Sequence, residues 1–128
     1  MDFDKRMDTG NKVDLSIVII SFNTKDLTLS CVDSVIKNTR GINYEVVMVE
    51  NGSSDGSVDA LRSLQGPKVR LIENKKNLGF AGANNQGWKK AAGEYVLFLN
   101  SDTLITDNVL GEMVEWMDKN ANVGVASC

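Results

Sequence analysis

The chain has 128 residues, with 14 Lys and Arg against 17 Asp and Glu, so its formal net charge is -3. It contains no histidine, which excludes Ser-His-Asp and Cys-His catalysis and a histidine-ligated zinc. A mildly acidic chain without a basic tract also argues against nucleic-acid binding. Any acid, base or metal ligand must therefore be a carboxylate, an amide, a lysine or a backbone group.

The two cysteines, Cys31 and Cys128, lie far apart, and a two-cysteine disulfide framework is not credible at this size. We therefore expect a reduced, cytoplasmic compartment. No apolar run approaches the roughly 18 residues of a membrane span, so we expect no transmembrane segment. Residues 1–13 alternate in charge and are expected to form a flexible leader to a folded part over residues 14–128.

The first half of the chain alternates between strand and helix patterns. Residues 15–21 carry apolar side chains at both parities, which predicts a strand buried on both faces. Residues 27–37 repeat apolar positions every three or four residues, which predicts an amphipathic helix. Residues 44–50 predict a second strand, and a short helix that ends at Gly66 follows it.

The second half continues this alternation. Residues 69–73 predict a third, brief strand, followed by a helix that ends at Gly93. Residues 95–99 predict a fourth strand, and residues 106–119 predict a helix with an apolar stripe. Residues 123–126 are predicted to begin a fifth strand.

This order predicts an α/β fold with a doubly wound, mostly parallel sheet. The glycine-rich stretch is not a dinucleotide fingerprint, because Gly79, Gly82 and Gly87 have the wrong spacing, and no Walker-type loop is present. Ligands of such sheets bind at the carboxyl ends of the strands. The segments after the strands are therefore the functional candidates: residues 21–23, 50–53, 74–82 and 100–103.

Asn100 and Asp102 follow the fourth predicted strand directly. Side chains two positions apart at a strand end can point the same way. A pair of oxygens of this kind suits a divalent cation that also carries phosphate ligands, such as magnesium or manganese. The alternative is an Asx-type turn that caps the next helix.

Glu50 and Asn51 end the second predicted strand. The amide of Asn51 offers donors and acceptors, which suits the edge of a nucleoside. The alternative is a plain turn in which Gly52 supplies a positive φ and a following Ser or Asp caps the next helix.

Asn84 falls on an apolar stripe with Phe80, Ala83 and Trp88. A buried amide needs hydrogen-bond partners, which are either a neighbouring loop or a ligand. Trp88 and Trp116 lie at helical spacing with other apolar residues and are expected to belong to the core.

Four segments follow one another in a characteristic order and spacing: SIVIISFN, VVMVENGSSDGS, NLGFAGANNQGW and GEYVLFLNSDT. Together they resemble the family 2 glycosyltransferases of the GT-A fold, and most of all their rhamnosyltransferase-like branch. The resemblance covers residues 15–128. It implies a Rossmann-like nucleotide-binding half, a nucleotide-diphospho-sugar donor and an inverting, metal-dependent transfer to a hydroxyl of a saccharide or lipid-linked acceptor. It also implies a role in the assembly of cell-surface polysaccharide. The implied location of the protein is the cytoplasm, at the inner face of the membrane.

The resemblance also assigns donor contacts by position. Ser21 and Phe22 match the segment that lines the nucleoside, and Asn51 falls where the family reads the base edge. Glu50 and Asn51 match the acidic pair that ends the second strand in the family. Many members have Asp-Asp or Asp-Asn at these two positions, so Glu50 is a longer substitution. The full donor-binding set implied is Ser21, Phe22, Glu50, Asn51, Gly79, Phe80, Asn84 and Asn100.

The segment from Asn100 to Asp102 matches the D-x-D motif of the family, with Asn in place of the first Asp. The resemblance implies that Asp102 is the ligand of manganese or magnesium and that Asn100 contacts the ribose or supports the metal. The replacement lowers the negative charge of the metal site.

In the family, the catalytic base lies well downstream of the D-x-D motif, and no residue of this chain is assigned to it. We therefore expect a truncated domain that supplies the donor-binding part and is inactive in isolation, with an exposed sheet edge that favours self-association. Two alternatives remain: a non-catalytic nucleotide-binding or interaction domain of the same fold, and a nucleotidyltransferase.

Overall fold

A computed structural model of the protein describes residues 12–127. Residues 1–11 of the expected leader, and Cys128, lie outside the described residues. Lys12 and Val13 contact the folded part. The side chain of Asn43 donates to the carbonyl of Lys12 at 2.5 Å, and the backbone N–H of Glu94 donates to the carbonyl of Val13 at 3.0 Å.

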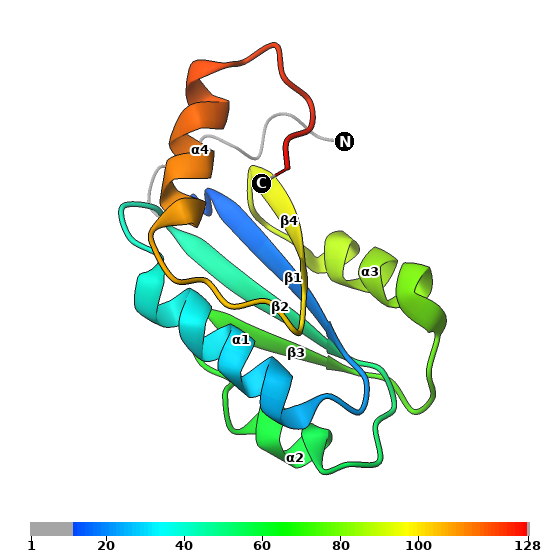
Figure 1. Ribbon diagram of the computed structural model, residues 1–128. Coiled ribbons are helices and arrows are strands. Elements are labelled where there is room, and N and C mark those ends of the chain that lie inside the picture. The colour runs from blue at the N-terminus through cyan, green and yellow to red at the C-terminus, as the bar shows by residue number, and fades with distance from the viewer. Residues whose placement is uncertain (1–11, 128) are drawn as a thin grey trace.

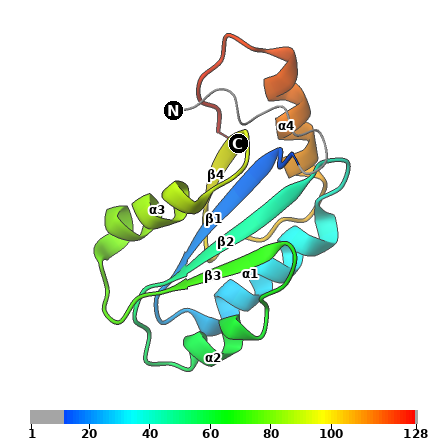
Figure 2. The same cartoon turned by 180° about the vertical axis from the view of Figure 1, so that it is seen from behind.

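The described residues form one parallel sheet of four strands in the order β3-β2-β1-β4, with helices on both faces (Figures 1 and 2). The expected α/β fold with a parallel sheet is therefore confirmed. The strands are β1 (Leu15–Ser21), β2 (Tyr44–Glu50), β3 (Val69–Glu73) and β4 (Tyr95–Asn100), and the helices are α1 (Lys25–Asn38), α2 (Ser57–Arg62), α3 (Gly79–Lys90) and α4 (Val109–Lys119).

The sheet is buried on both faces of its central strands. On one face, Ile17 and Ile19 of β1 pack in a core with α1 and α4, including Val35 and Leu110. On the other face, α3 covers β1 and β2. Burial on both sides explains why the central strands carry apolar residues at both parities.

The close approach of α3 to the sheet requires a glycine. A Cβ atom on Gly87 would lie 2.3 Å from Cγ1 of Val18, which is closer than real contacts allow. Gly87 therefore fixes the height of α3 above β1, and with it the position of Gly79, where α3 begins at the carboxyl edge of the sheet.

The structure corrects the predicted start of the last helix, which begins at Val109 rather than at residue 106. The backbone of Ile105 is bonded to α1 instead: its N–H donates to Oγ of Ser34 at 3.0 Å, and its carbonyl accepts from Nδ2 of Asn38 at 2.7 Å. Because these polar groups already have partners, the segment before Val109 stays non-helical.

The predicted fifth strand is also wrong for the described residues 123–127, which form no strand. Val125 is 89% exposed, and the backbone N–H of Val123 donates to the carbonyl of Asn120 in a turn. A short apolar run of this kind becomes a strand only where another strand pairs with it, and β4 lies at the edge of the described sheet.

Trp88 and Trp116 were expected in the core but are about half exposed. The buried positions of α3 are the small residues Ala83 and Gly87, because the helix lies too close to the sheet for a large side chain between them. Within residues 12–127, no helix is both long enough and apolar enough to cross a membrane.

Candidate functional site

Parallel strands end at a common edge, so the four candidate segments lie together at the carboxyl edge of the sheet (Figure 1). After β1, Ser21 is buried and its hydroxyl lies 3.0 Å from that of Thr28, whereas Phe22 is 42% exposed. Asn23 adopts a φ of +52° and accepts a hydrogen bond from the backbone of Ser54 at 2.8 Å. The first segment is therefore tied to the second.

Asp55 strengthens this tie because it caps two helices. Its carboxylate accepts from the backbone N–H of Lys25, at the start of α1, and from that of Ser57, at the start of α2, both at 3.0 Å. Hydrogen bonds from the hydroxyl of Ser57 and from the backbone of Lys25 lower the pKa of Asp55. The charged form of Asp55 thus holds the loops after β1 and β2 together.

The end of β2 is organised by the buried carboxylate of Glu50. Its two oxygens accept from the backbone N–H groups of Gly52 at 3.1 Å and Ser53 at 2.8 Å. Gly52 has a φ of +85°, and a Cβ atom there would lie 2.8 Å from the backbone of Lys76. The turn after β2 and the loop after β3 are therefore in direct contact.

Asn51 is only 2% exposed, and its amide is bonded to the loop after β3. Its Oδ1 accepts from the backbone N–H of Leu78 at 3.0 Å and from Nδ2 of Asn74 at 3.1 Å. Its Nδ2 donates to Oδ1 of Asn77 at 2.9 Å and, at a longer 3.4 Å, to the carbonyl of Gly79. A primary amide has two donors and two acceptor sites, so these bonds fill its capacity.

The start of α3 presents side chains that the protein leaves open. Gly79 has a φ of +77°, and its N–H donates to Oδ1 of Asn77 at 2.8 Å. Phe80, the next residue, is 65% exposed. Asn84, one turn later, is half-buried, and its side chain makes no hydrogen bond to another residue of the 12–127 range. Phe80 and Asn84 are thus available to a ligand.

The turn after β4 is open as well. Asn100 and Asp102 are exposed, and their side chains form no hydrogen bond or ion pair with the rest of the described chain. The backbone N–H of Thr103 donates to the carbonyl of Asn100 at 3.1 Å, which closes the turn. Beneath it, the buried thiol of Cys31 donates to the same carbonyl at 3.7 Å, and burial raises the pKa of this thiol to about 11.

The described residues contain no cluster of three or more Asp, Glu, Cys or His side chains that could hold a metal ion by themselves. Asp102 offers one carboxylate. Magnesium is commonly held by one or two carboxylates, with substrate phosphates and water as the other ligands. The residues therefore fit a divalent ion only if it arrives together with a phosphate-bearing ligand.

Three site residues were not singled out from the sequence: Asn74, Asn77 and Gln86. Asn74 and Gln86 form a reciprocal amide pair, with bonds of 2.6 and 2.9 Å, which connects the loop after β3 to α3. The signal that could have found them is the concentration of amide side chains between residues 74 and 86, although their pairing depends on the fold.

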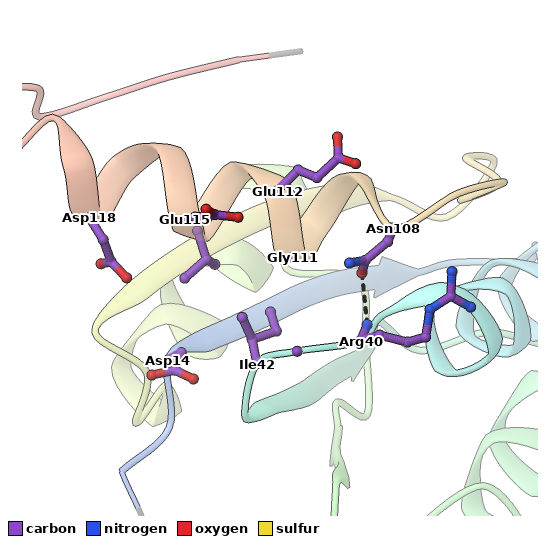
Figure 3. Close-up of a pocket in the computed structure, with 10 residues that line it drawn as sticks. Asp14, Arg40, Ile42, Asn108, Gly111, Glu112, Glu115 and Asp118 are labelled. Atoms are coloured by element: carbon purple, nitrogen blue, oxygen red, sulfur yellow. Dashed lines mark hydrogen bonds between the residues drawn. The ribbon is translucent and has the colours of Figure 1, made fainter.

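A pocket of about 310 Å³ lies at the opposite, amino-terminal edge of the sheet (Figure 3). There the backbone N–H of Arg40 donates to Oδ1 of Asn108 at 2.8 Å. None of the candidate residues lines this pocket, and its many carboxylates do not suit a phosphate ligand. Its acidic lining residues are Asp14, Glu112, Glu115 and Asp118.

Comparison with known proteins gives a consistent result. The sequence model of the family described as "Glycosyl transferase family 2" matches residues 16–128. A poly(ribitol-phosphate) beta-glucosyltransferase of Bacillus spizizenii is 38% identical over 100 residues, which are 75% of this chain and 16% of that protein.

Solved structures share the fold. TarS 1-349 of S. aureus, in complex with UDP-GlcNAc, superposes with a TM-score of 0.77 at 21% identity, over 90% of this chain and 37% of that one. The mannosyltransferase PcManGT from Pyrobaculum calidifontis, in complex with GDP-Man and Mn²⁺, gives 0.73 at 24% identity, over 83% and 32%. The chain spans less than half the length of each of these proteins.

Proposed function

Because the chain belongs to glycosyl transferase family 2, we propose that it binds a nucleotide-diphospho-sugar at the carboxyl edge of its sheet and serves an inverting transfer of the sugar to an acceptor hydroxyl. The observation that carries this proposal is the set of side chains left open at that edge. Phe22, Phe80, Asn84, Asn100 and Asp102 are exposed or without protein partners there, while the residues around them are bonded. The UDP-GlcNAc and GDP-Man complexes of proteins with the same fold support a donor of this class.

In this proposal each segment has its own part in holding the donor. The rings of Phe22 and Phe80 offer flat apolar surface to the nucleoside, as aromatic side chains do for bases. Glu50 and Asn51 shape the site at the end of β2, and Asn100 contacts the ribose or supports the metal ion. The full set of residues proposed to bind the donor or to shape its site is Ser21, Phe22, Glu50, Asn51, Gly79, Phe80, Asn84 and Asn100.

Asp102 is proposed as the protein ligand of a divalent cation, manganese or magnesium, that binds with the diphosphate. When bound, such an ion neutralises the negative charge that develops on the leaving nucleoside diphosphate. Asn100, two positions earlier, adds an amide oxygen without adding charge. The Mn²⁺ complex of the mannosyltransferase supports this assignment.

The finer features of the function are also proposals. Residues 14–128 form the donor-binding part, bind donor without transferring it by themselves, and leave the catalytic base to a residue outside this range. The acceptor is a saccharide or lipid-linked saccharide of cell-surface polysaccharide assembly, at the cytoplasmic face of the membrane. The resemblance of the four motifs supports the rhamnosyltransferase-like branch.

Calorimetric titration of the chain with UDP, GDP and dTDP, each with and without Mn²⁺, tests the proposal. We expect saturable binding of at least one nucleotide and tighter binding with Mn²⁺. Failure of all three to bind would overturn the proposal. Asp102 is the only acid of the D-x-D-like segment. Nucleotide binding that Mn²⁺ does not affect would therefore mean that this segment holds no metal ion, and it would favour the alternative of a non-catalytic nucleotide-binding domain.

A further inference from the structure

We propose that Asn51 is a positioning residue of the donor site rather than a reader of the nucleobase. It acts through Asn74, Asn77 and Gln86, which together with Asn51 we call the amide network. The network holds the loop after β3 and the start of α3 in place, so that Gly79 and Phe80 meet the donor. This inference rests on the proposed function, because it names how one part of that site works.

The first step is the hydrogen-bonding capacity of Asn51. All four of its positions are used within the protein, and the side chain is almost completely buried. To contact a base, Asn51 would have to release one of these bonds. The release would break one of the hydrogen bonds that hold the loop after β3 against the end of β2.

The second step is that the orientation of the amide is fixed by the backbone. The N–H of Leu78 can only donate, so the atom 3.0 Å from it must be the oxygen of Asn51. The carbonyl of Gly79 can only accept, so the atom facing it must be the nitrogen. Rotating the amide by 180° would place like groups against each other at both positions.

The third step is the continuity of the network. Oδ1 of Asn77 accepts from both Asn51 and the backbone N–H of Gly79, which fixes the first residue of α3. Nδ2 of Asn74 donates to both Asn51 and Gln86, and Gln86 returns a bond to Asn74. The end of β2 is thereby connected to the second turn of α3 through the loop between them.

The consequence concerns affinity and selectivity. A residue that reads the base changes the relative affinities for UDP, GDP and dTDP when it is replaced. A residue that positions Gly79 and Phe80 changes all three affinities by the same factor. Gln86 distinguishes the two roles further, because it acts through Asn74 in this account and has no part in reading the base.

The test uses Asn51→Ala and Gln86→Ala, with Asn85→Ala as the matched control. Asn85 is an exposed amide on the same helix, without a side-chain hydrogen bond to the described residues. We expect Asn51→Ala and Gln86→Ala to weaken UDP, GDP and dTDP binding by a common factor, about tenfold for Asn51→Ala. A changed ratio among the three nucleotides in Asn51→Ala, with Gln86→Ala unchanged, would overturn the inference.

A second measurement does not depend on nucleotide binding. Amide hydrogen exchange at Leu78 and Gly79 should accelerate in Asn51→Ala and Gln86→Ala, while the amides of Val18 and Val47 in the sheet stay protected. Retained protection at Leu78 in Asn51→Ala would contradict the positioning role. If the parent chain binds no nucleotide, the proposed function fails, whereas the exchange data still decide whether the network positions the loop.

Discussion

The two sides of the carboxyl edge are built in different ways. After β2, the buried side chain of Glu50 accepts two backbone hydrogen bonds, and that of Asn51 makes four bonds to the loop after β3. After β4, the side chains of Asn100 and Asp102 are exposed and bond to no other described residue. One side is shaped by the protein before any ligand arrives, whereas the other keeps its polar groups free for a ligand.

This difference separates stability from binding. Replacements on the β2 side should lower the free energy of unfolding, and should affect binding because the shape of the site changes. Replacements on the β4 side should affect binding alone. A prebuilt wall also lowers the cost of binding, because its side chains and backbone need no further ordering.

The largest effect is expected for Gly52→Ala. Gly52 has a φ of +85°, and the added Cβ would lie 2.8 Å from the backbone of Lys76. We expect a loss of about 3 kcal/mol in the free energy of unfolding, measured by urea denaturation. Gly41→Ala is the control, because Gly41 has a φ of +79° with no atom within 4 Å of the added Cβ, and should lose about 1 kcal/mol. Equal losses would contradict the contact between the two loops.

The next effect is expected for Glu50→Ala, which removes the acceptor of two backbone N–H groups. We expect a loss of about 2 kcal/mol in the free energy of unfolding, together with weaker nucleotide binding. The control is Glu45→Ala, which removes another buried carboxylate, one that accepts from Ser16 and Ala92 at the amino-terminal edge. It should lower stability without affecting binding. Weaker binding at unchanged stability in Glu50→Ala would mean that Glu50 contacts the ligand itself.

Asp102→Asn should show the opposite behaviour. We expect the free energy of unfolding to change by less than about 0.5 kcal/mol, because Asp102 is exposed and bonds to no described residue. The Mn²⁺-dependent gain in nucleotide affinity should fall by about tenfold, which is about 1.4 kcal/mol. Glu112→Gln removes an exposed charge at the other edge and should leave this gain intact. If Asp102→Asn binds nucleotide and Mn²⁺ like the parent, Asp102 is not the metal ligand.

The smallest effect is expected for the pH dependence of Asp55. Its hydrogen bonds from Ser57 and Lys25 place its pKa in the folded protein below the ordinary value of 3.8. The charged form therefore stabilises the fold above that pH, and this stabilisation is lost as the pH falls through the lowered pKa. The stability difference between the parent and Asp55→Ala should accordingly shrink as the solution is acidified below pH 3.8.

Asp26→Ala controls for the helix dipole, because Asp26 also lies in the first turn of α1. A difference between the parent and Asp55→Ala that stays constant with pH would contradict the role of the ionised Asp55 carboxylate as a cap.

The strands could be predicted because burial on both faces leaves a local pattern. The bounds of β1, β2 and β3 agree with the sequence prediction, and β4 extends one residue further, to Asn100. The start of α4 could not be predicted in this way, since Ile105 is held by Ser34 and Asn38, far away in the chain. The run at residues 123–126 has the right composition for a strand but no partner strand among the described residues.

The position of the candidate site was predicted from the sequence, but which of its side chains are hydrogen-bonded within the protein was predicted only in part. The carboxyl ends of parallel strands must meet, so the four segments could be placed from their order alone. The distinction between Asn51, which is bonded on all sides, and Asn84, which is bonded on none, could not be made. Asn51 follows a buried strand and Asn84 lies on an apolar stripe of a helix. Their difference depends on whether Asn74, Asn77 and Leu78 come within hydrogen-bonding distance.

Amide hydrogen exchange of the parent chain, measured without ligand and with a saturating nucleotide and Mn²⁺, tests the contrast between the two sides most directly. We predict that the amides of Leu78 and Gly79 are already protected without ligand and change little, while protection at residues 101–104 rises when the nucleotide binds. Rapid exchange at Leu78 and Gly79 until the nucleotide is added would contradict a wall built by the protein itself.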